Sequence, residues 1–521
     1  MNLFLTFSDA AKFADIARNL INGLGYGAKF TFWGGGTFEL VKHGLFPSTW
    51  TPPLMPLFIA GFFKTFGISD ITVIATSIFF FILLVLFTYL LGNRLFGRVA
   101  GLLSALAVAS NINLIDYATS GASELLFAFE IVIAAYLITL KKKRATLLTF
   151  IFMVLMYFTR PQAFIYIAGL ILYWLLIIFK NNKAIIMFLG VLMAGFLVDH
   201  FILSSFAGKY FIYPIIGRGE YALKQITTSG ASSDALRGAF QQATSTSVIK
   251  IIFYNLYNFY RLLPQIASPY LWAFFIIGLL MRGKDKIANA FRISVIFIVL
   301  TTFLATALTI PLFRYLHPVI PFVYISAVAT LVWIVEKMVS DWLLVAGGKL
   351  RSQITSHRSL ITGVMSTTLI CFFVVGQTLG VIFLDSRFEK NTHNVGKPPV
   401  YVVLSRILKD NTMPDQIIIT NLDTWGSWYG ERKTVWYPLT PGQIIPPKGE
   451  RSPFDVIYLT SYLMDDENYY MGEEWRQIFE NPKNPKDEFI AKNYKFVKEF
   501  SITADETFEK QSARAILLVK K

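Results

Sequence analysis

Long apolar runs alternate with short polar segments over the first 384 residues of the chain. A helix that crosses a bilayer needs about 20 mostly apolar residues. Runs that approach or exceed this length predict about ten spanning helices, at residues 72–93, 99–117, 120–140, 145–159, 161–179, 184–205, 262–281, 288–310, 317–336 and 360–384. The pattern therefore predicts an α-helical polytopic membrane protein.

The pattern changes after residue 385. Five short runs with strand character, "DQIIITN", "RKTVWYPL", "FDVIYLTSYL", "YKFVKEFSI" and "ARAILLVKK", are separated by polar turns and by helix-like pieces at 399–411 and 472–480. Such short alternating elements are typical of a small α/β domain. We therefore expect a transmembrane domain over 1–384, with outer loops 1–70 and 206–260, and a soluble α/β domain over 385–521.

Charge sets the expected orientation. The chain carries 48 Lys and Arg against 33 Asp and Glu, a net charge of +15, but only 16% of its residues are charged and 54% are hydrophobic. Much of the positive charge lies in alternate short loops, at Arg94 and Arg98, 141–144, Lys180 and Lys183, 282–286, and 337–358. Because such loops face the cytoplasm, the charge marks topology, not nucleic-acid binding. We expect both termini and all long polar segments on the outer face of the plasma membrane.

The first outer segment contains two expected helices. Ser8 is a suitable N-cap for a helix whose apolar positions Phe13, Ile16 and Leu20 share one face. Residues 52–66, "PPLMPLFIAGFFKTF", are too short to span and predict a helix in the membrane interface. The opening "MNLFLTF" is too short for a spanning helix or a signal peptide.

Several acids lie where the chain meets the outer surface. Asp9 stands in the first turn of the first expected helix, Asp116 and Glu124 flank a short outer turn, and Glu130 lies deeper in the same span as Glu124. An ionisable group in hydrocarbon is costly and is a functional candidate. The alternatives are a first-turn acid that complements the helix dipole at Asp9, interfacial loop charges, and an interhelical hydrogen bond at Glu130.

Basic residues occupy the outer ends of other spans. Arg160 lies in "FTRPQAF", and Arg314 lies in "PLFRYLHPVIPF" with Tyr315 and His317. The long outer loop adds Lys209, Arg218 and Tyr221. A guanidinium binds phosphate through two parallel hydrogen bonds, so these cations suit an anionic ligand at the membrane surface. Snorkelling to lipid headgroups is the alternative, above all for lysine.

Several catalytic signatures are missing from the sequence. It holds no Gly-rich phosphate loop ending in Lys-Ser/Thr, no HExxH, no paired cysteine ligands and no nucleophile elbow. Nucleotide chemistry and serine-triad hydrolysis therefore have no support. The single cysteine, Cys371, lies in an apolar run and forms no intrachain disulfide.

Six stretches, taken in order, resemble a known family. They are "SDAAKFADIARNL", "TPPLMPLFIAGFFKTFG", "GNRLFGRVAGLLSALAVAS", "TSGASELLFAFEIVIAAYLI", "TRPQAF" and "FRYLHPVIPF". Over about residues 1–340 their order and topology are similar to the C-type (GT-C fold) membrane glycosyltransferases, which include protein O-mannosyltransferases and the lipid A aminoarabinose transferase. The resemblance implies sugar transfer from a polyprenyl-phosphate carrier to an acceptor hydroxyl on the extracytoplasmic side, with inversion.

The resemblance also implies roles for particular residues. Asp9 matches the acid of the first outer loop, which acts as the base or positions the acceptor, and Glu124 matches the second outer acid. Arg314 and Arg160 match basic positions near the carrier phosphate, with Arg218 and Lys209 as further phosphate-binding candidates. The substrate-binding candidates are Tyr315, His317 and Tyr221. One departure is the absence of a spanning helix before Asp9.

Some questions stay open at this stage. No cofactor is required, but Mg²⁺ or Mn²⁺ beside Asp9 and Glu124 is an open alternative because oxygen ligands suit both ions. Two other classes compete with the enzyme: a transporter or flippase of lipid-linked glycans, which predicts charges near the midplane and paired discontinuous helices, and a non-catalytic membrane scaffold. The loop "TWGSWYGERKTVWYP" either faces carbohydrate or fills the core of the C-terminal domain.

Overall fold

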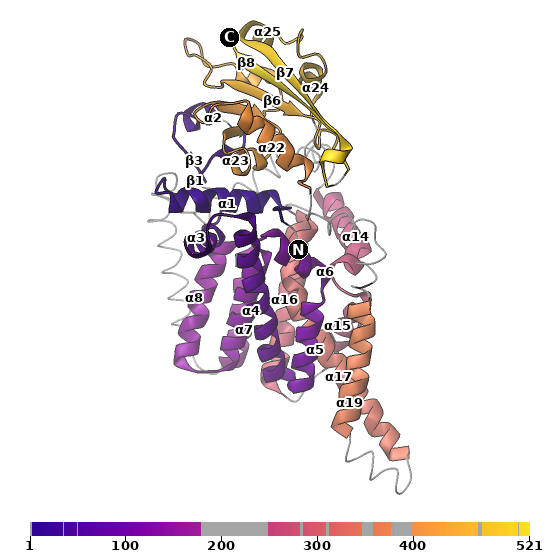
Figure 1. Cartoon of the computed structure of the whole chain (residues 1–521). Helices are drawn as coiled ribbons and strands as arrows, with labels where there is room; N and C mark the ends of the chain where they lie inside the picture. Colours follow the sequence, from indigo (N-terminus) through magenta and orange to yellow (C-terminus); the bar gives the residue numbers. More distant parts are fainter. Residues whose placement is uncertain are drawn as a thin grey trace. The chain divides into compact units, whose positions relative to one another are not determined.

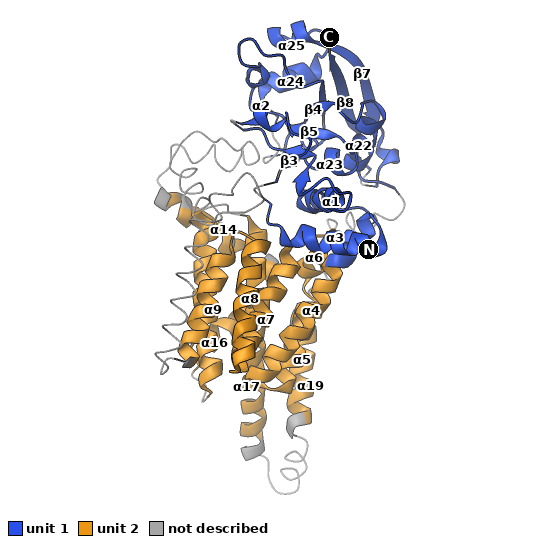
Figure 2. Cartoon of the chain, turned by 90° about the vertical axis from the view of Figure 1, so that its left-hand side faces the viewer, with its two compact units in different colours: residues 1–76, 196–248, 390–521 blue, residues 77–195, 249–389 orange. Residues whose placement is uncertain are grey.

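The computed structural model describes residues 3–34, 36–48, 51–178, 248–281, 285–308, 312–345, 358–376, 379, 397–466, 471–508 and 510–521. These residues fall into two compact units (Figure 2). Unit 1 comprises residues 1–76, 196–248 and 390–521, and unit 2 comprises residues 77–195 and 249–389. Sequence reasoning grouped the N-terminal segment with the transmembrane helices, whereas compactness groups it with the C-terminal residues. The functional domain boundaries stay a prediction.

Unit 2 is helical (Figure 1). Its described elements are α4 (Asp70–Phe96, which begins in unit 1), α5 (Arg98–Ala109), α6 (Ile112–Ser120), α7 (Glu124–Thr139), α8 (Lys143–Thr159), α9 (Ala163–Ile178), α14 (Val248–Ile266), α15 (Pro269–Leu279), α16 (Lys286–Leu308), η4 (Phe313–Tyr315), η5 (His317–Val319), α17 (Ile320–Val345), α19 (Arg358–Ile370) and the π-helical η6 (Cys371–Val375).

Three helical stretches among the described residues are long and apolar enough to cross a membrane: Asp70–Phe96, Lys286–Leu308 and Phe313–Trp342. Two bent pairs raise that number to five, Arg98–Ala109 with Ile112–Ser120 at 57° and Ile252–Pro264 with Pro269–Leu279 at 114°. Helices are confirmed at nine of the ten expected spans, and the tenth, 184–205, lies outside the described residues. The count of ten spans stays a prediction.

The expected span 99–117 is two helices. Asn111 follows α5 and caps α6, since its side-chain oxygen accepts hydrogen bonds from the backbone N–H groups of Asn113 and Leu114. Gly121 ends α6 in the left-handed conformation, at φ 81°. The bend therefore comes from an internal N-cap in the middle of an apolar run, and it gives the chain a short helix before the turn that leads into α7.

Glycines allow two pairs of helices in unit 2 to approach closely. A Cβ added at Gly101 of α5 would lie 2.6 Å from the backbone nitrogen of Asn93 and 2.8 Å from the carbonyl oxygen of Tyr89, both in α4. A Cβ added at Gly169 of α9 would lie 2.1 Å from Cγ1 of Ile298 in α16. Small residues at such crossings are how helices pack tightly in lipid.

Unit 1 contains a six-stranded sheet in the order β2-β5-β4-β6-β8-β7. Its strands are β2 (Phe30–Thr31), β4 (Ile417–Thr420), β5 (Lys433–Trp436), β6 (Val456–Thr460), β7 (Tyr494–Ile502) and β8 (Ala513–Lys520). β2, β5, β4 and β6 run parallel, and β8 and β7 are antiparallel to their neighbours. All five strands expected after residue 385 are confirmed, but the sixth comes from the N-terminal segment, which sequence reasoning missed.

Smaller elements complete unit 1. They are α1 (Ser8–Ile21), α2 (Thr37–Leu40), α3 (Leu54–Phe66), α22 (Val400–Asp410), α23 (Trp425–Trp428), α24 (Glu473–Glu480), α25 (Glu488–Asn493), the 3₁₀ turns η7 (Pro441–Ile444) and η8 (Ala504–Glu506), and the short antiparallel pair β1 (Gly27–Ala28) and β3 (Phe46–Pro47). The helices expected at 399–411, 472–480 and 52–66 are confirmed as α22, α24 and α3.

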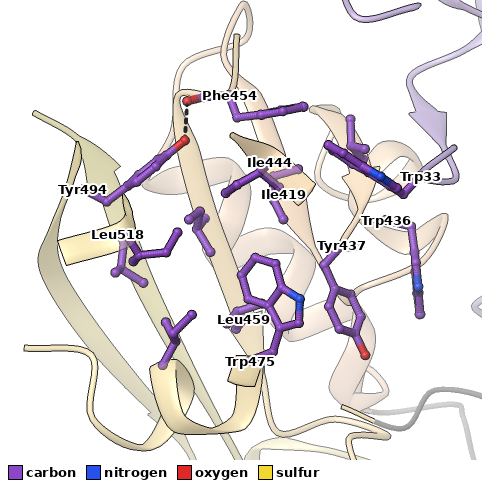
Figure 3. Packing of buried hydrophobic residues seen from close by; sticks show 14 of the residues in the cluster. Trp33, Ile419, Trp436, Tyr437, Ile444, Phe454, Leu459, Trp475, Tyr494 and Leu518 are labelled. Atoms are coloured by element: carbon purple, nitrogen blue, oxygen red, sulfur yellow. Dashed lines mark hydrogen bonds between the residues drawn. The ribbon is translucent and has the colours of Figure 1, made fainter. Parts of the chain in front are cut away.

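The core on one side of the sheet joins both ends of the chain (Figure 3). Trp33 of the N-terminal segment packs with Phe454, at a ring distance of 5.5 Å, while Trp475 of α24 donates a hydrogen bond to the carbonyl of Pro438. Tyr494 donates to the carbonyl oxygen of Phe454 at 3.0 Å, the bond drawn in Figure 3. Residues near 30 therefore belong to the same folded body as the last hundred residues.

The helix expected from Ser8 is confirmed as α1, with Phe13 and Ile16 buried and Leu20 partly buried. The expected cap is wrong. Phe7 occupies the N-cap position, and it makes no side-chain hydrogen bond to the first turn. Ser8 is instead the first helical residue, and its backbone carbonyl accepts a hydrogen bond from Thr424. The start of α1 is therefore held in part by a residue far away in the sequence.

Candidate functional site

Glu124 and Arg160 form a buried ion pair in unit 2. Nη1 of Arg160 lies 2.7 Å from Oε1 of Glu124, and the two side chains are 8% and 4% exposed. The same Nη1 donates to Oγ of Ser123 at 3.2 Å. Glu124 begins α7 and Arg160 directly follows α8, so the antiparallel α7–α8 hairpin brings them to one end of the bundle. The structure thus brings two of the sequence candidates into contact.

The turn η4 contributes a second arginine. The guanidinium carbon of Arg314 lies 5.5 Å from the centre of the Tyr315 ring, and that of Arg160 lies 5.4 Å from the same centre. Cations above a tyrosine face are attracted by its ring electrons. Tyr315 is therefore within cation–π distance of both arginines that we expect to bind phosphate.

His317, in the next turn, is buried and contacts Tyr117 of α6. The Tyr117 hydroxyl and Nδ1 of His317 are 2.5 Å apart. Within the described residues, Nε2 of His317 is buried without a hydrogen-bond partner. A buried polar atom is costly to leave unsatisfied, so this nitrogen suits contact with a ligand group. His317 is the first residue of η5 and Pro318 the second, and the fixed φ of proline favours the tight turn at this point.

These side chains form one group, which we call the polar cluster: Asp116, Tyr117, Glu124, Arg160, Arg314, Tyr315 and His317. Tyr117 joins the group through its hydroxyl contact with His317, and Asp116 directly precedes it in α6. Tyr117 was missed by sequence reasoning, because a tyrosine at the outer end of an apolar helix normally indicates an interfacial anchor. The signal was its place next to Asp116 before the "TSGASE" turn.

Glu130 makes an interhelical hydrogen bond, which was the structural alternative for this residue. Oγ1 of Thr159 in α8 donates to Oε1 of Glu130 in α7 at 2.9 Å, and the glutamate is 1% exposed. The bond joins the two helices of the hairpin next to the ion pair, since Thr159 directly precedes Arg160. Glu130 therefore helps to hold α7 against α8 beside the polar cluster.

Asp9 lies in unit 1, in the first turn of α1, and is partly exposed. The buried acid of this helix is Asp15, one of whose oxygens lies 2.5 Å from Nη2 of Arg18 while the other accepts the backbone N–H of Lys29 at 2.6 Å. Burial raises the pKa of Asp15, and Arg18 and the Lys29 amide partly offset this. Asp15 is therefore a structural acid, and Asp9 is the more accessible one.

The loop "TWGSWYG" packs inside unit 1. Trp425 stacks on Tyr401 at a ring distance of 4.2 Å, and Trp428 stacks on Phe63 of α3 at 6.1 Å. Nε1 of Trp428 donates to Asp70 at 2.6 Å. These contacts agree with the core-filling alternative, in which the aromatic side chains hold the N-terminal helices against the C-terminal sheet.

Three predicted site residues, Lys209, Arg218 and Tyr221, lie outside the described residues. The described residues also give no support for a Mg²⁺ or Mn²⁺ site. Across the described ranges, no group of three or more His, Cys, Asp or Glu side chains is gathered as an ion would require. Asp9 and Glu124 belong to different units, and their roles stay predictions.

Comparisons with known proteins bear on the fold. The family model described as dolichyl-phosphate-mannose-protein mannosyltransferase matches residues 51–201. No curated protein matches the sequence.

Solved structures match over nearly the whole chain. ArnT from Cupriavidus metallidurans in the apo state has a TM-score of 0.53 at 13% identity, over 99% of this chain and 94% of that one. The archaeal oligosaccharyltransferase AglB from Archaeoglobus fulgidus, in complex with an inhibitory peptide and a dolichol-phosphate, has a TM-score of 0.52 at 14% identity, over 91% of this chain and 67% of that one. The resemblance inferred from the sequence is thus confirmed at the level of the fold: the chain has the GT-C fold of polytopic membrane glycosyltransferases.

Proposed function

We propose that this protein transfers a sugar from a polyprenyl-phosphate carrier to an acceptor hydroxyl on the extracytoplasmic face of the plasma membrane, with inversion. Asp9 takes the proton from the acceptor or positions it, and Glu124 is the second acid. Arg314 and Arg160 stabilise the carrier phosphate as it leaves, with Arg218 and Lys209 as further phosphate contacts. Tyr315, His317 and Tyr221 contact the substrate.

The fold and the family model support a glycosyltransferase that uses a lipid-linked donor. The matching model describes enzymes that use dolichyl-phosphate-mannose, and AglB is similar in fold and was solved with a dolichol-phosphate. A carrier of this kind needs its isoprenoid tail in lipid and its phosphate at the surface. The apolar helices of unit 2 suit the first requirement, and the polar cluster suits the second.

The observation that carries the proposal is the pair of arginines beside Tyr315. A sugar phosphate is already activated, so transfer chiefly requires cations that stabilise charge on the leaving phosphate and a base that takes the hydroxyl proton. Arg160 is already paired with Glu124 at 2.7 Å. We expect Arg314 to carry more of the phosphate binding, and Arg160 to fix the position of the Glu124 carboxylate.

The role of Asp9 rests on its place in the first turn of α1 and on the motif that it matches. The extracytoplasmic location rests on the distribution of Lys and Arg among the loops.

The test is transfer from a labelled polyprenyl-phosphate sugar in nanodiscs, with a panel of sugars and acceptors. We expect Asp9→Asn to lose at least about 100-fold in kcat, as removal of a general base does. Arg314→Lys keeps the charge but loses the planar fork, so KM for the donor should rise about tenfold.

The matched control is Arg292→Lys. Arg292 is a partly buried arginine of α16 whose guanidinium lies 5.3 Å from the Phe96 ring centre and donates to the carbonyl of Met281. Its variant should keep the wild-type KM. Equal effects of the two lysine variants would remove Arg314 from donor binding. Full activity of Asp9→Asn would remove Asp9 from the mechanism, and binding without transfer for every donor would favour the scaffold.

A further inference from the structure

The residues just before Asp9 are held by tyrosines of the C-terminal part of unit 1. The backbone N–H of Leu5 donates to the Tyr429 hydroxyl at 2.9 Å, and the Tyr401 hydroxyl donates to the carbonyl oxygen of Leu5 at 2.7 Å. Leu5 itself is fully buried. The backbone N–H and C=O of Leu5 are therefore both fixed by side chains that lie about 400 positions away in the sequence.

A third contact falls on the neighbour of Asp9. Oγ1 of Thr424 donates to the carbonyl oxygen of Ser8 at 2.5 Å. Thr424 is itself fixed, because its N–H donates to Oδ1 of Asp423 and its carbonyl accepts from the Ser427 hydroxyl. The donor is 2% exposed, so the bond is shielded from competing water.

The remainder of α1 is fastened to the same loop. Arg18, in the last turn, donates to the carbonyl oxygens of Ser427 at 2.8 Å and Trp428 at 3.0 Å, and its guanidinium carbon lies 4.7 Å from the Trp428 ring centre. Both ends of the helix that carries Asp9 are thus attached to the loop that follows β4.

The start of α1 lacks a cap of its own. Phe7 at the N-cap position offers no side-chain hydrogen bond, and such a cap usually contributes about 1 kcal/mol to a helix. The hydrogen bonds from Tyr401 and Thr424 and to Tyr429 therefore hold the backbone at the start of α1. We call these three residues the α1 anchor.

We propose that the α1 anchor positions the Asp9 carboxylate, so that the C-terminal domain is a working part of the active site. This inference rests on the function proposed above for Asp9. A base displaced by about 1 Å loses much of its effect, because rate depends steeply on the approach of the reacting groups. Thr424 contacts the backbone of Ser8, the neighbour of Asp9, and the two tyrosines contact the backbone of Leu5, so all three are positioning residues.

The decisive variants are Thr424→Val, which removes the hydroxyl and keeps the shape, and Thr424→Ser, which keeps the hydroxyl. We expect Thr424→Val to lower kcat about tenfold with KM for the donor within about twofold of wild type, and Thr424→Ser to restore at least half of kcat. Tyr401→Phe should behave like Thr424→Val. Equal kcat values for Thr424→Val and Thr424→Ser would overturn the proposal.

The matched control is Tyr458→Phe. The Tyr458 hydroxyl is buried in the same domain and donates to the carbonyl of Leu404 at 3.0 Å, away from residues 5–9. It loses a comparable hydrogen bond, so its thermal midpoint should fall as much as that of Tyr401→Phe while kcat stays at the wild-type value. If kcat falls equally in both tyrosine variants, the effect is loss of stability and the proposal fails.

A readout other than activity separates this inference from the proposed function. Hydrogen exchange followed by mass spectrometry on the full chain should show faster exchange in residues 4–14 of Thr424→Val and Tyr401→Phe, and unchanged exchange there in Tyr458→Phe. Unchanged exchange in all three would overturn the positioning role whatever Asp9 does. Faster exchange together with full activity of Asp9→Asn would overturn the proposed role of Asp9. The α1 anchor would then hold the backbone without any effect on catalysis.

Discussion

Glu124 and Arg160 are 36 residues apart in the sequence, yet their side chains meet at 2.7 Å and both are less than a tenth exposed. Helix α7 begins at the glutamate and α8 ends just before the arginine. The hairpin between them thus fixes a buried charged pair inside the helical bundle of unit 2. Each charge of such a pair stabilises the other, because a single buried charge without a partner carries a large desolvation cost.

Breaking this pair from one side should be strongly destabilising. We expect Arg160→Met to lower the free energy of unfolding by about 3–5 kcal/mol, because Glu124 is then left buried and unpaired. The double variant Glu124→Gln/Arg160→Met should recover most of that loss. Thermal unfolding in detergent measures both. Lys409→Met, which breaks an exposed pair with Glu431, is the control and should cost less than about 1 kcal/mol. A small loss in Arg160→Met would contradict the prediction.

Removing the Tyr117 hydroxyl should affect the proposed transfer reaction through His317. Tyr117→Phe leaves Nδ1 of His317 without the partner that orients the ring. We expect kcat/KM to fall about 3- to 10-fold, which corresponds to one hydrogen bond of about 1 kcal/mol. The control is Tyr173→Phe, whose hydroxyl is buried with no partner among the described residues, and it should leave kcat/KM unchanged. An equal response of the two variants would show that His317 needs no orientation.

Packing between α4 and α5 should depend on Gly101. In Gly101→Ala the added Cβ meets backbone atoms of α4 at 2.6 and 2.8 Å, and backbone cannot move aside cheaply. We expect a loss of about 1–3 kcal/mol in the free energy of unfolding. Gly363→Ala in α19 is the matched control, since nothing lies within 4 Å of its added Cβ. Alanine is the better helix former, so this variant should be neutral or gain up to about 1 kcal/mol. The same midpoint for both variants would refute close packing at Gly101.

Removing the partner of Asp15 should make stability depend on pH. In Arg18→Met the pKa of Asp15 should rise further, because burial then acts without the neighbouring cation. The folded state then keeps the proton at pH values where the unfolded state has lost it, so stability falls as pH rises through the folded-state pKa. The loss relative to wild type should be larger at about pH 8 than at about pH 5. Asp15→Asn/Arg18→Met lacks the titrating group, so its loss should be equal at both pH values. A loss in Arg18→Met that does not change with pH would show that Asp15 stays charged without its partner.

Periodicity predicted the local elements well. The strands after residue 385 and the helices at 399–411 and 472–480 were found from apolar alternation and turn residues alone. The break at Asn111 was missed because one capping side chain interrupts a long apolar run. The N-cap at Phe7 was missed because α1 begins at Ser8 itself, the residue that local sequence favours as the cap. Local sequence also cannot show that Phe30 pairs with Thr434, since that contact is decided by the rest of the sheet.

The candidate site was predicted in part. Glu124, Arg160, Arg314, Tyr315 and His317 were all singled out from their places at the ends of apolar runs, and the structure gathers them in one cluster. The hairpin geometry that joins Glu124 to Arg160 follows from sequence, because a short loop forces neighbouring helices to run antiparallel. The contact of Tyr117 with His317 does not, since it links elements 200 residues apart.

The edge strand β2 has a consequence for how the protein is made. Residues Phe30–Thr31 leave the ribosome about 400 residues before their partner strand Lys433–Trp436, a delay of about 20–80 s at ordinary rates of translation. During that interval the apolar side chains around Trp33 lack the C-terminal residues that they pack against in the folded protein. The N-terminal segment therefore completes its fold only after the last part of the chain has been synthesised, and early termination of translation would leave it exposed to the cell's quality control.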